Sequence, residues 1–310
     1  MSKSLKKVTL KDLKKTFGTK FFSSNFIGIF KKKKLEYTQV NKDINSKIIK
    51  DCINIILKDK KKIDSKKRKK IWMDGWNQNY IDYRKNPKNL KLLTPHFIKS
   101  NFPKRFLKKF IIPKSKNFEY SLFELFREDL FQKYFIKYEN IYEFGCGTGI
   151  NLLALKKKFS NKSIFGSDFV KSSGKIIDLI NKTFRYNIKF DIFDVKKPNR
   201  KYKFKPNSLV FTTGVIEQVG NDYKKFINFL LEKKPDMVIN MEPFKEIYNL
   251  NNKMDLLSYF FIKKRGYAKN FLNYLKLLES KKKIKIMKIK RTYFGSVLMD
   301  SYNYVVWKIL

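Results

Sequence analysis

The sequence is poor in several residue types, and each scarcity excludes a class of protein. Its 310 residues include only two cysteines, Cys52 and Cys146, too few for a disulfide framework or a thiolate zinc site. The single histidine, His96, has no neighbouring cluster of metal ligands, so we expect a structural or surface role and no bound metal. Apolar runs such as 256–262 are too short to span a bilayer, and residues 1–15 lack the apolar core of a signal peptide. We therefore expect a soluble, cytoplasmic protein in a reducing compartment.

Acidic residues are also scarce, and two explanations fit the resulting positive charge. Lys and Arg number 71 against 27 Asp and Glu, a net charge of +44, and only eight of the 71 are Arg. A/T-rich codon usage would enrich Lys together with Asn, Ile, Phe and Tyr. Alternatively, the lysines dock nucleic acid or an anionic membrane surface, although phosphate readers favour Arg. Lysines spread evenly over the surface would fit codon usage, and lysines lining a cleft would fit a polyanionic partner.

The first 135 residues show no alternation of strands and helices. Residues 44–57 carry apolar side chains at helical spacing, which predicts an amphipathic helix. Residues 72–83 are dense in aromatic and amide side chains. We interpret them as a polar helix or loop packed on the main domain, with a substrate-side lid as the alternative. We therefore divide the chain into a mainly helical N-terminal extension, 1–135, which is a candidate lid, and a main domain, 136–310.

From about residue 139 the pattern changes to strands that alternate with helices. Strands are expected at 141–144, 163–166, 188–193, 209–212 and 237–240. Helices are expected at 152–159, 170–180 and 223–233, and a long helical stretch at 250–280 precedes strand-like runs at 284–290 and 302–309. This order predicts an α/β fold with a doubly wound, mostly parallel seven-stranded sheet and an antiparallel edge.

The segment from Glu143 to Asn151 carries the main functional signal. Its glycines, Gly145, Gly147 and Gly149, let the backbone turn tightly and approach a ligand where a Cβ would clash. The helix that follows offers free N–H groups at its start. A dinucleotide fingerprint would need a small residue at position 150, which is Ile, and the Gly-Lys-Ser/Thr ending of a P-loop is absent.

The Gly-x-Gly-x-Gly spacing, with Glu143 two residues before it, resembles motif I of the class I, Rossmann-like S-adenosylmethionine-dependent methyltransferases. This resemblance covers roughly residues 139–310. It implies a loop that wraps the methionine part of S-adenosylmethionine, with Glu143 contacting the amino group. The cofactor-binding candidates from this part of the chain are Glu143, Gly145, Cys146, Gly147, Gly149, Asn151 and Thr213.

Two further acids follow the next two predicted strands. A carboxylate at Asp168 can accept hydrogen bonds from both ribose hydroxyls of an adenosine cofactor. Its alternative role is to cap the helix expected near Val170. The resemblance implies that Asp194 binds the adenine amino group and that the backbone of Val195 contacts the ring. Acids after three successive strands, following a glycine loop, are much more specific than any one of them alone.

Candidate acceptor residues follow the fourth and fifth predicted strands, since ligands of open parallel sheets bind outside the carboxyl ends of strands. Glu217 and Gln218 look like the Glu-His or Glu-Gln pair of several families that methylate small molecules. They would position the acceptor or remove its proton, and the alternative is a helix-starting acid in a loop. Glu242 is a second candidate. The Asn-Pro-Pro-Tyr signature of amino methylation on nucleic acids or proteins is absent.

The resemblance thus implies a methyltransferase that uses S-adenosylmethionine and acts on an oxygen or nitrogen of a small molecule. A sugar or a surface-polysaccharide precursor is the narrower expectation. Two alternatives stay open: an RNA- or lipid-directed methyltransferase that docks through its lysines, and a non-catalytic protein that binds the cofactor. The tail Arg291–Ser296 resembles that of uncharacterised bacterial methyltransferases, which implies no substrate, and the sequence does not indicate an oligomeric state.

Overall fold

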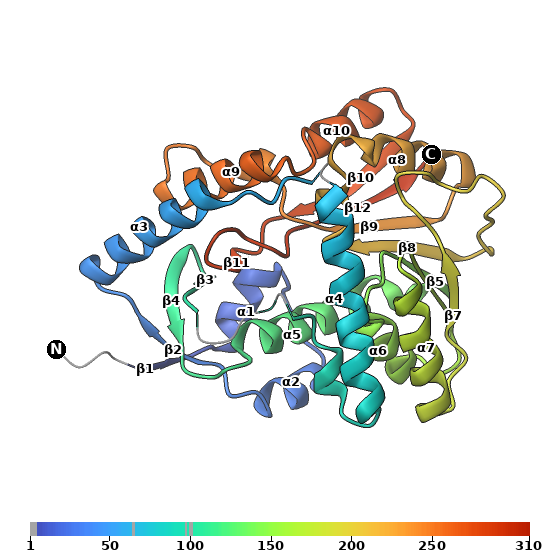
Figure 1. The fold of residues 1–310 in the computed structure, drawn as a ribbon, viewed down its shortest axis with the longest axis horizontal. Helices are drawn as coiled ribbons and strands as arrows, with labels where there is room; N and C mark the ends of the chain where they lie inside the picture. The colour runs from blue at the N-terminus through green and yellow to red at the C-terminus, as the bar shows by residue number, and fades with distance from the viewer. Residues whose placement is uncertain (1–4, 64–65, 97, 99–101) are drawn as a thin grey trace.

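A seven-stranded sheet forms the centre of the computed structural model, which describes residues 5–63, 66–96, 98 and 102–310 (Figure 1). Its strand order is β10-β12-β9-β8-β5-β6-β7. The parallel strands are β5 (Asn140–Phe144), β6 (Ser163–Asp168), β7 (Lys189–Ile192), β8 (Ser208–Thr213) and β9 (Met237–Met241). The antiparallel edge consists of β12 (Tyr304–Ile309) and β10 (Ile284–Lys290). The predicted mostly parallel sheet with an antiparallel edge is confirmed.

Helices cover both faces of this sheet because successive strand side chains point to opposite sides. Ile141 belongs to one buried cluster and Tyr142, its neighbour on β5, to the other. The Ile141 side is covered by α5 (Phe118–Lys133), α6 (Ile150–Lys158) and α7 (Lys171–Phe184). The Tyr142 side is covered by α8 (Tyr223–Lys233) and α10 (Phe271–Ser280). The sheet is therefore doubly wound, as its sequence pattern predicts.

The chain reverses its direction across the sheet at β5. It runs outward from β5 through β6 to β7, then returns past β5 to β8 and continues to β9. The connection after β5 therefore runs over one face of the sheet, and the connection after β8 runs over the other face. Because the two connections diverge, a crevice opens outside the carboxyl ends of these strands. The loops that follow these two strands carry the predicted glycine segment and the predicted acceptor residues.

Most predicted helices appear close to their expected bounds, with one division. The stretch 250–280 forms two helices, α9 (Lys253–Arg265) and α10, because Gly266 adopts a left-handed conformation with φ 70° and ends α9. The predicted helix 44–57 is α3 (Lys42–Lys58), which buries Ile48, Cys52 and Ile56 in a cluster shared with α9.

The N-terminal extension is mainly helical, but it also contains a small sheet that its sequence did not lead us to expect. Its helices are α1 (Leu10–Phe17), α2 (Ser24–Lys31), α3, α4 (Lys66–Lys85) and α5. The strands are β1 (Leu5–Lys7), β2 (Glu36–Gln39), β4 (Lys109–Pro113), β3 (Lys104–Phe106) and β11 (Phe294–Gly295). These strands have two to five residues, too few for an alternating pattern to stand out. Since β11 comes from the C-terminal tail, the extension and the main domain share this sheet.

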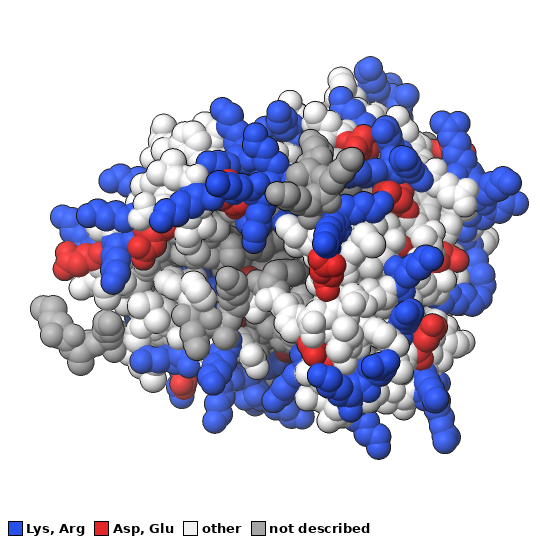
Figure 2. Space-filling view, viewed as in Figure 1, with Lys and Arg blue, Asp and Glu red and all other residues white. Residues whose placement is uncertain are grey.

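Lys and Arg side chains are scattered over the face of the molecule drawn in Figure 2, and they do not gather in one patch there. On this face the distribution fits the codon-usage explanation of the charge. In the part of the chain that the structure describes, no helix is long and apolar enough to cross a membrane.

Candidate functional site

The glycine-rich loop between β5 and α6 has the backbone conformation that its sequence predicts. Gly145, Gly147 and Gly149 have φ values of 71°, 53° and 68°, a region that is costly for residues with a Cβ. The N–H groups of Gly145 and Cys146 both donate to the carbonyl of Ser167, at 2.7 and 3.0 Å. These bonds tie the loop to the end of β6.

Two bulky side chains lie directly on this loop. A Cβ built on Gly145 would lie 2.4 Å from Cγ2 of Val215, and one built on Gly147 would lie 2.8 Å from Cζ2 of Trp76. Val215 follows β8, whereas Trp76 belongs to α4 of the extension. Residues 72–83 thus form part of a helix that packs on the main domain, the first of the two interpretations of this segment.

Glu143 lies near the carboxyl end of β5, an inner strand of the sheet, and has one oxygen without a partner. Its side chain is 1% exposed, and Oε1 accepts a 2.7 Å hydrogen bond from the Asn151 amide. The Asn151 oxygen in turn accepts a 3.0 Å bond from the Arg127 guanidinium. Oε2 of Glu143 is buried with no hydrogen-bond partner, and burial raises the pKa of this carboxyl to about 8. A buried polar atom left unpaired is unfavourable, so Oε2 indicates a position for a ligand donor.

Asp168 lies beside the glycine loop at the end of β6. Its Oδ2 accepts a 2.9 Å bond from the Gly147 N–H, and its Oδ1 accepts a 3.0 Å bond from the Val170 N–H. Burial raises the pKa of Asp168 to about 6, and the charge of Asp194 adds to this rise. The residue preceding α7 is Val170, so Asp168 is not the helix cap that the alternative interpretation required.

The remaining cofactor candidates are Cys146 in the glycine loop and Thr213, Asp194 and Val195, which follow or end neighbouring strands. Cys146 has a buried thiol, and its Sγ would lie 3.2 Å from a Cβ built on Gly166, so it faces β6. Thr213 Oγ1 lies 3.5 Å from the Asn151 amide nitrogen. Asp194 accepts a 2.9 Å bond from the Lys196 N–H, and Val195 is buried in the apolar cluster beneath it.

Glu217, in the 3-10 segment Ile216–Asp222, has an environment like that of Glu143. Its Oε1 accepts a 2.5 Å bond from the Gln218 amide, and its Oε2 is buried without a partner. The Gln218 oxygen accepts bonds from Nε and Nη2 of Arg68, at 3.1 and 2.6 Å. Burial, and then the nearby charge of Glu242, raise the pKa of Glu217 to about 8.

Glu242 shapes the loop that carries Glu217. Oε1 of Glu242 accepts bonds from the Thr212 hydroxyl at 2.8 Å and the Val215 N–H at 3.1 Å. Its Oε2 accepts a 3.2 Å bond from the Glu217 N–H. Both oxygens are thus engaged by protein donors, and burial raises the pKa of Glu242 to about 7. This geometry gives Glu242 a structural role in the loop.

Sequence reasoning missed the two arginines, Arg68 and Arg127, and the contact of Trp76 with the loop. A signal was available for the arginines. Only eight arginines occur among 71 basic residues, and three of them, Arg68, Arg105 and Arg127, are buried. A buried guanidinium requires specific partners, so a rare Arg in a Lys-rich chain marks a position where its geometry is needed.

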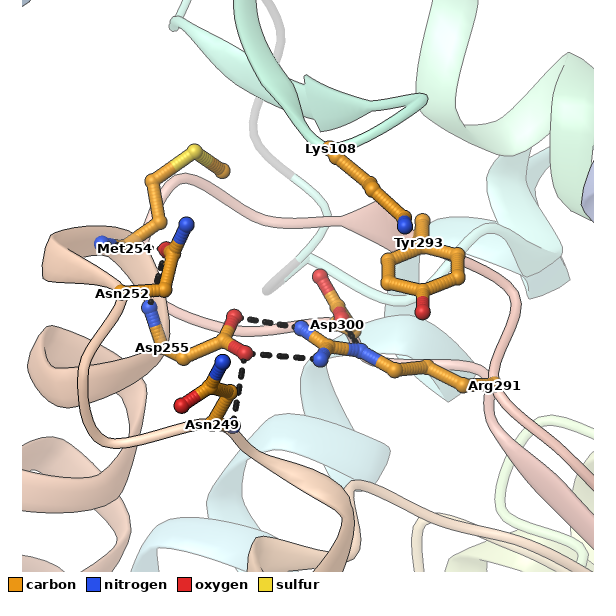
Figure 3. Close-up of a pocket in the computed structure, with 8 residues that line it drawn as sticks. All are labelled: Lys108, Asn249, Asn252, Met254, Asp255, Arg291, Tyr293 and Asp300. Atoms are coloured by element: carbon orange, nitrogen blue, oxygen red, sulfur yellow. Dashed lines mark hydrogen bonds and ion pairs between the residues drawn. The ribbon is translucent and has the colours of Figure 1, made fainter.

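Two other candidates lie apart from this site. His96 has a 57% exposed side chain whose Nε2 lies 3.4 Å from an Asp82 oxygen. The cavity in Figure 3 contains none of the predicted site residues in its lining. There Arg291 donates to both oxygens of Asp255, at 2.7 and 2.5 Å, and to Asp300 at 2.8 Å. The predicted tail therefore has its arginine paired within the protein, where it joins α9 to the segment before β12.

Comparisons with known proteins give matches in structure but not in sequence. No protein-family model matches the chain, and no curated protein matches it. The methyltransferase domain of bacterial CtHen1 has 17% identity and a TM-score of 0.43, covering 59% of this chain and 95% of that one. The pyocyanin biosynthetic protein PhzM has 12% identity and a TM-score of 0.45, covering 64% and 60%.

Proposed function

We propose that this chain is a class I S-adenosylmethionine-dependent methyltransferase that methylates an oxygen or nitrogen of a small molecule. The observation that carries the proposal is the unpartnered Oε2 of Glu143, buried near the end of β5 beside three left-handed glycines. An oxygen in that position accepts a hydrogen bond from a cationic amino group, and the glycines let the loop turn tightly beside it. When bound, the cofactor supplies an activated methyl group on a sulfonium.

The residues around the loop fit the other parts of this cofactor. Asp168 would bind the ribose hydroxyls, since its oxygens are held by backbone N–H groups and keep further lone pairs. Asp194 and Val195, after β7, would contact the adenine. Asn151 donates to Glu143 and would hold its carboxylate in place for the amino group, and Thr213 lies beside the Asn151 amide.

Glu217 and Gln218 would act on the acceptor. The free Oε2 of Glu217 can accept the proton of an acceptor hydroxyl or amine, and a group with a pKa of about 8 exchanges protons readily near neutral pH. Because α4 contacts both the glycine loop through Trp76 and Gln218 through Arg68, the acceptor side is partly enclosed. This enclosure, with the scattered lysines on the face drawn in Figure 2, favours a small acceptor over RNA or a lipid surface at this face. Hydroxyl-bearing molecules, including sugars and surface-polysaccharide precursors, are the acceptors to screen first.

The first test is calorimetry of the full chain with S-adenosylhomocysteine. We expect binding by the wild type, loss of binding in Glu143→Ala, and unchanged binding in the control Glu139→Gln. Glu139 is an exposed residue that precedes the same strand at its opposite end. Absence of binding by folded wild-type protein would overturn the proposal.

The second test is a screen of metabolite fractions with methyl-labelled S-adenosylmethionine. Transfer of label to a small molecule that depends on Glu217 would support the assigned reaction. Cofactor binding without transfer to any fraction, RNA or lipid would instead indicate a non-catalytic binding protein. Transfer to RNA or lipid alone would contradict the small-molecule acceptor.

A further inference from the structure

Arg68 is a buried cation whose partners are an amide oxygen and an aromatic ring. It is 7% exposed, its guanidinium donates two bonds to the Gln218 oxygen, and it lies 5.0 Å from the centre of the Trp72 ring. Within the described part of the chain, no carboxylate forms an ion pair with Arg68. A charge buried this way is unfavourable unless a compensating charge lies nearby.

Glu217 carries such a charge when it is ionised, and the side chain of Gln218 lies between it and Arg68. The amide of Gln218, held by Arg68 at its oxygen, donates its N–H to Oε1 of Glu217. An amide whose oxygen is held by a cation becomes a stronger and better oriented donor, because bonds in a chain polarise one another. The orientation also fixes which Glu217 oxygen is occupied and leaves Oε2 for the acceptor.

We propose that Arg68 is a positioning residue for Glu217, which it orients and keeps able to ionise through the side chain of Gln218. The proposal rests on the function assigned above and adds to it a residue from outside the main domain. Since Arg68 belongs to α4, the acceptor side is complete only while α4 of the extension packs on α7 and the loops of the main domain.

Other groups near Glu217 also affect whether its carboxyl is ionised. Glu242, after β9, disfavours the charged form of Glu217, as does burial. Arg265 of α9 favours the charged form, as Arg68 does. Tyr267, after α9, and Tyr302, before β12, are phenols whose pKa values are raised mainly by burial. The charge of Glu217 adds to the rise at both, after that of Glu119 in the case of Tyr302. The two arginines therefore favour the ionised form of Glu217, whereas burial and the charge of Glu242 disfavour it.

The experiment measures the pKa of Glu217 by carbon NMR on full-length protein labelled at the glutamate side-chain carboxyl, with Glu217→Gln to assign the signal. Arg68→Met should raise this pKa by about one pH unit, since a nearby cation favours the carboxylate. Arg68→Lys, which keeps the charge but not the two-bond contact, should give a smaller rise. The matched control is Arg84→Met, which removes the same charge from an exposed position near the other end of α4.

Gln218→Leu provides an independent variant, because it removes the hydrogen bonds between Arg68 and Glu217 without removing Arg68. This substitution should also raise the pKa of Glu217. S-adenosylhomocysteine affinity, measured on the same variants, should stay within about 2-fold of wild type. An unchanged Glu217 pKa in both Arg68→Met and Gln218→Leu, or an equal rise in Arg84→Met, would overturn the proposal. Failure of the wild type to bind S-adenosylhomocysteine would instead overturn the assigned function and leave the coupling of Arg68 to Glu217 measurable.

Discussion

The two halves of the candidate site contain the same arrangement of side chains. On the cofactor side, Arg127 holds the Asn151 oxygen, and the Asn151 amide donates to Glu143. On the acceptor side, Arg68 holds the Gln218 oxygen, and the Gln218 amide donates to Glu217. In both halves the second carboxylate oxygen is buried without a partner, and burial raises the carboxyl pKa to about 8.

The difference between the halves lies in what supports them. Glu143 is part of β5, an inner strand of the sheet. Arg127 comes from α5, where its guanidinium lies 5.7 and 5.9 Å from the ring centroids of Phe123 and Phe131 in the core. Glu217 is in a short 3-10 segment, and its arginine comes from α4. The comparison suggests a cofactor half built into the sheet and an acceptor half that depends on a helix of the extension.

The largest effect expected from this difference is on cofactor affinity. Glu143→Ala should weaken S-adenosylhomocysteine binding about 100-fold, because a charge-assisted bond to a buried carboxylate is lost. Glu217→Ala should change it less than about 2-fold. Calorimetry on both variants checks this prediction. Equal losses of affinity would contradict the division of the site into a cofactor half and an acceptor half.

The pH dependence of binding should follow Glu143. Its folded-state pKa of about 8 means that the carboxyl is mostly protonated at pH 7 and must lose that proton to accept a bond from a cationic amine. S-adenosylhomocysteine affinity should therefore rise about 8-fold from pH 7.0 to 8.5. Glu143→Gln should abolish this rise and Glu217→Gln should keep it; a flat wild-type profile would contradict the assignment.

Arg127→Met should weaken S-adenosylhomocysteine binding about 5-fold, because Asn151 loses the donor that orients its amide toward Glu143. Arg68→Met should leave S-adenosylhomocysteine binding unchanged, because the hydrogen bonds that start at Arg68 lead to Glu217 and not to Glu143. Thermal unfolding of both variants controls for loss of structure. A larger loss for Arg68→Met would mean that α4 supports the cofactor half as well.

The raised carboxyl pKa values also predict a fall in stability as pH rises. An acid with a folded pKa of about 8 and an unfolded pKa near 4.5 binds more protons when folded, so its contribution is present below pH 4.5 and is lost by pH 8. Between pH 5.5 and 8.5 the melting temperature of Glu217→Gln should therefore fall a few °C less than that of the wild type. Parallel curves would contradict the raised pKa.

The smallest effect concerns fluorescence. Of the three tryptophans, Trp76 touches the glycine loop, while Trp307 is buried in β12 and donates to Asn240. Binding of S-adenosylhomocysteine should change tryptophan emission, and Trp76→Phe should remove most of that change. An undiminished signal in Trp76→Phe would show that α4 does not contact the occupied loop.

Much of the main domain was predictable because its signals are local. Glycines at every second position before a helix, acids after successive apolar strands, and the alternation of strands with helices each depend on a few neighbouring residues. The small sheet of the extension was not predictable, because its strands are short and one of them, β11, comes from the other end of the chain. The role of Glu242 was also missed, since its N–H partners are residues of a different loop.

The sequence by itself determined the doubly wound sheet, the glycine loop and the acids that follow its strands, because hydrophobic period and turn chemistry act over a few residues. Only the tertiary structure decided which side chains complete the site. Arg127, Arg68 and Trp76 lie 24, 150 and 71 positions from their partners Asn151, Gln218 and Gly147. Packing of the extension's helices on the main domain brings them together, and no short sequence pattern predicts that packing.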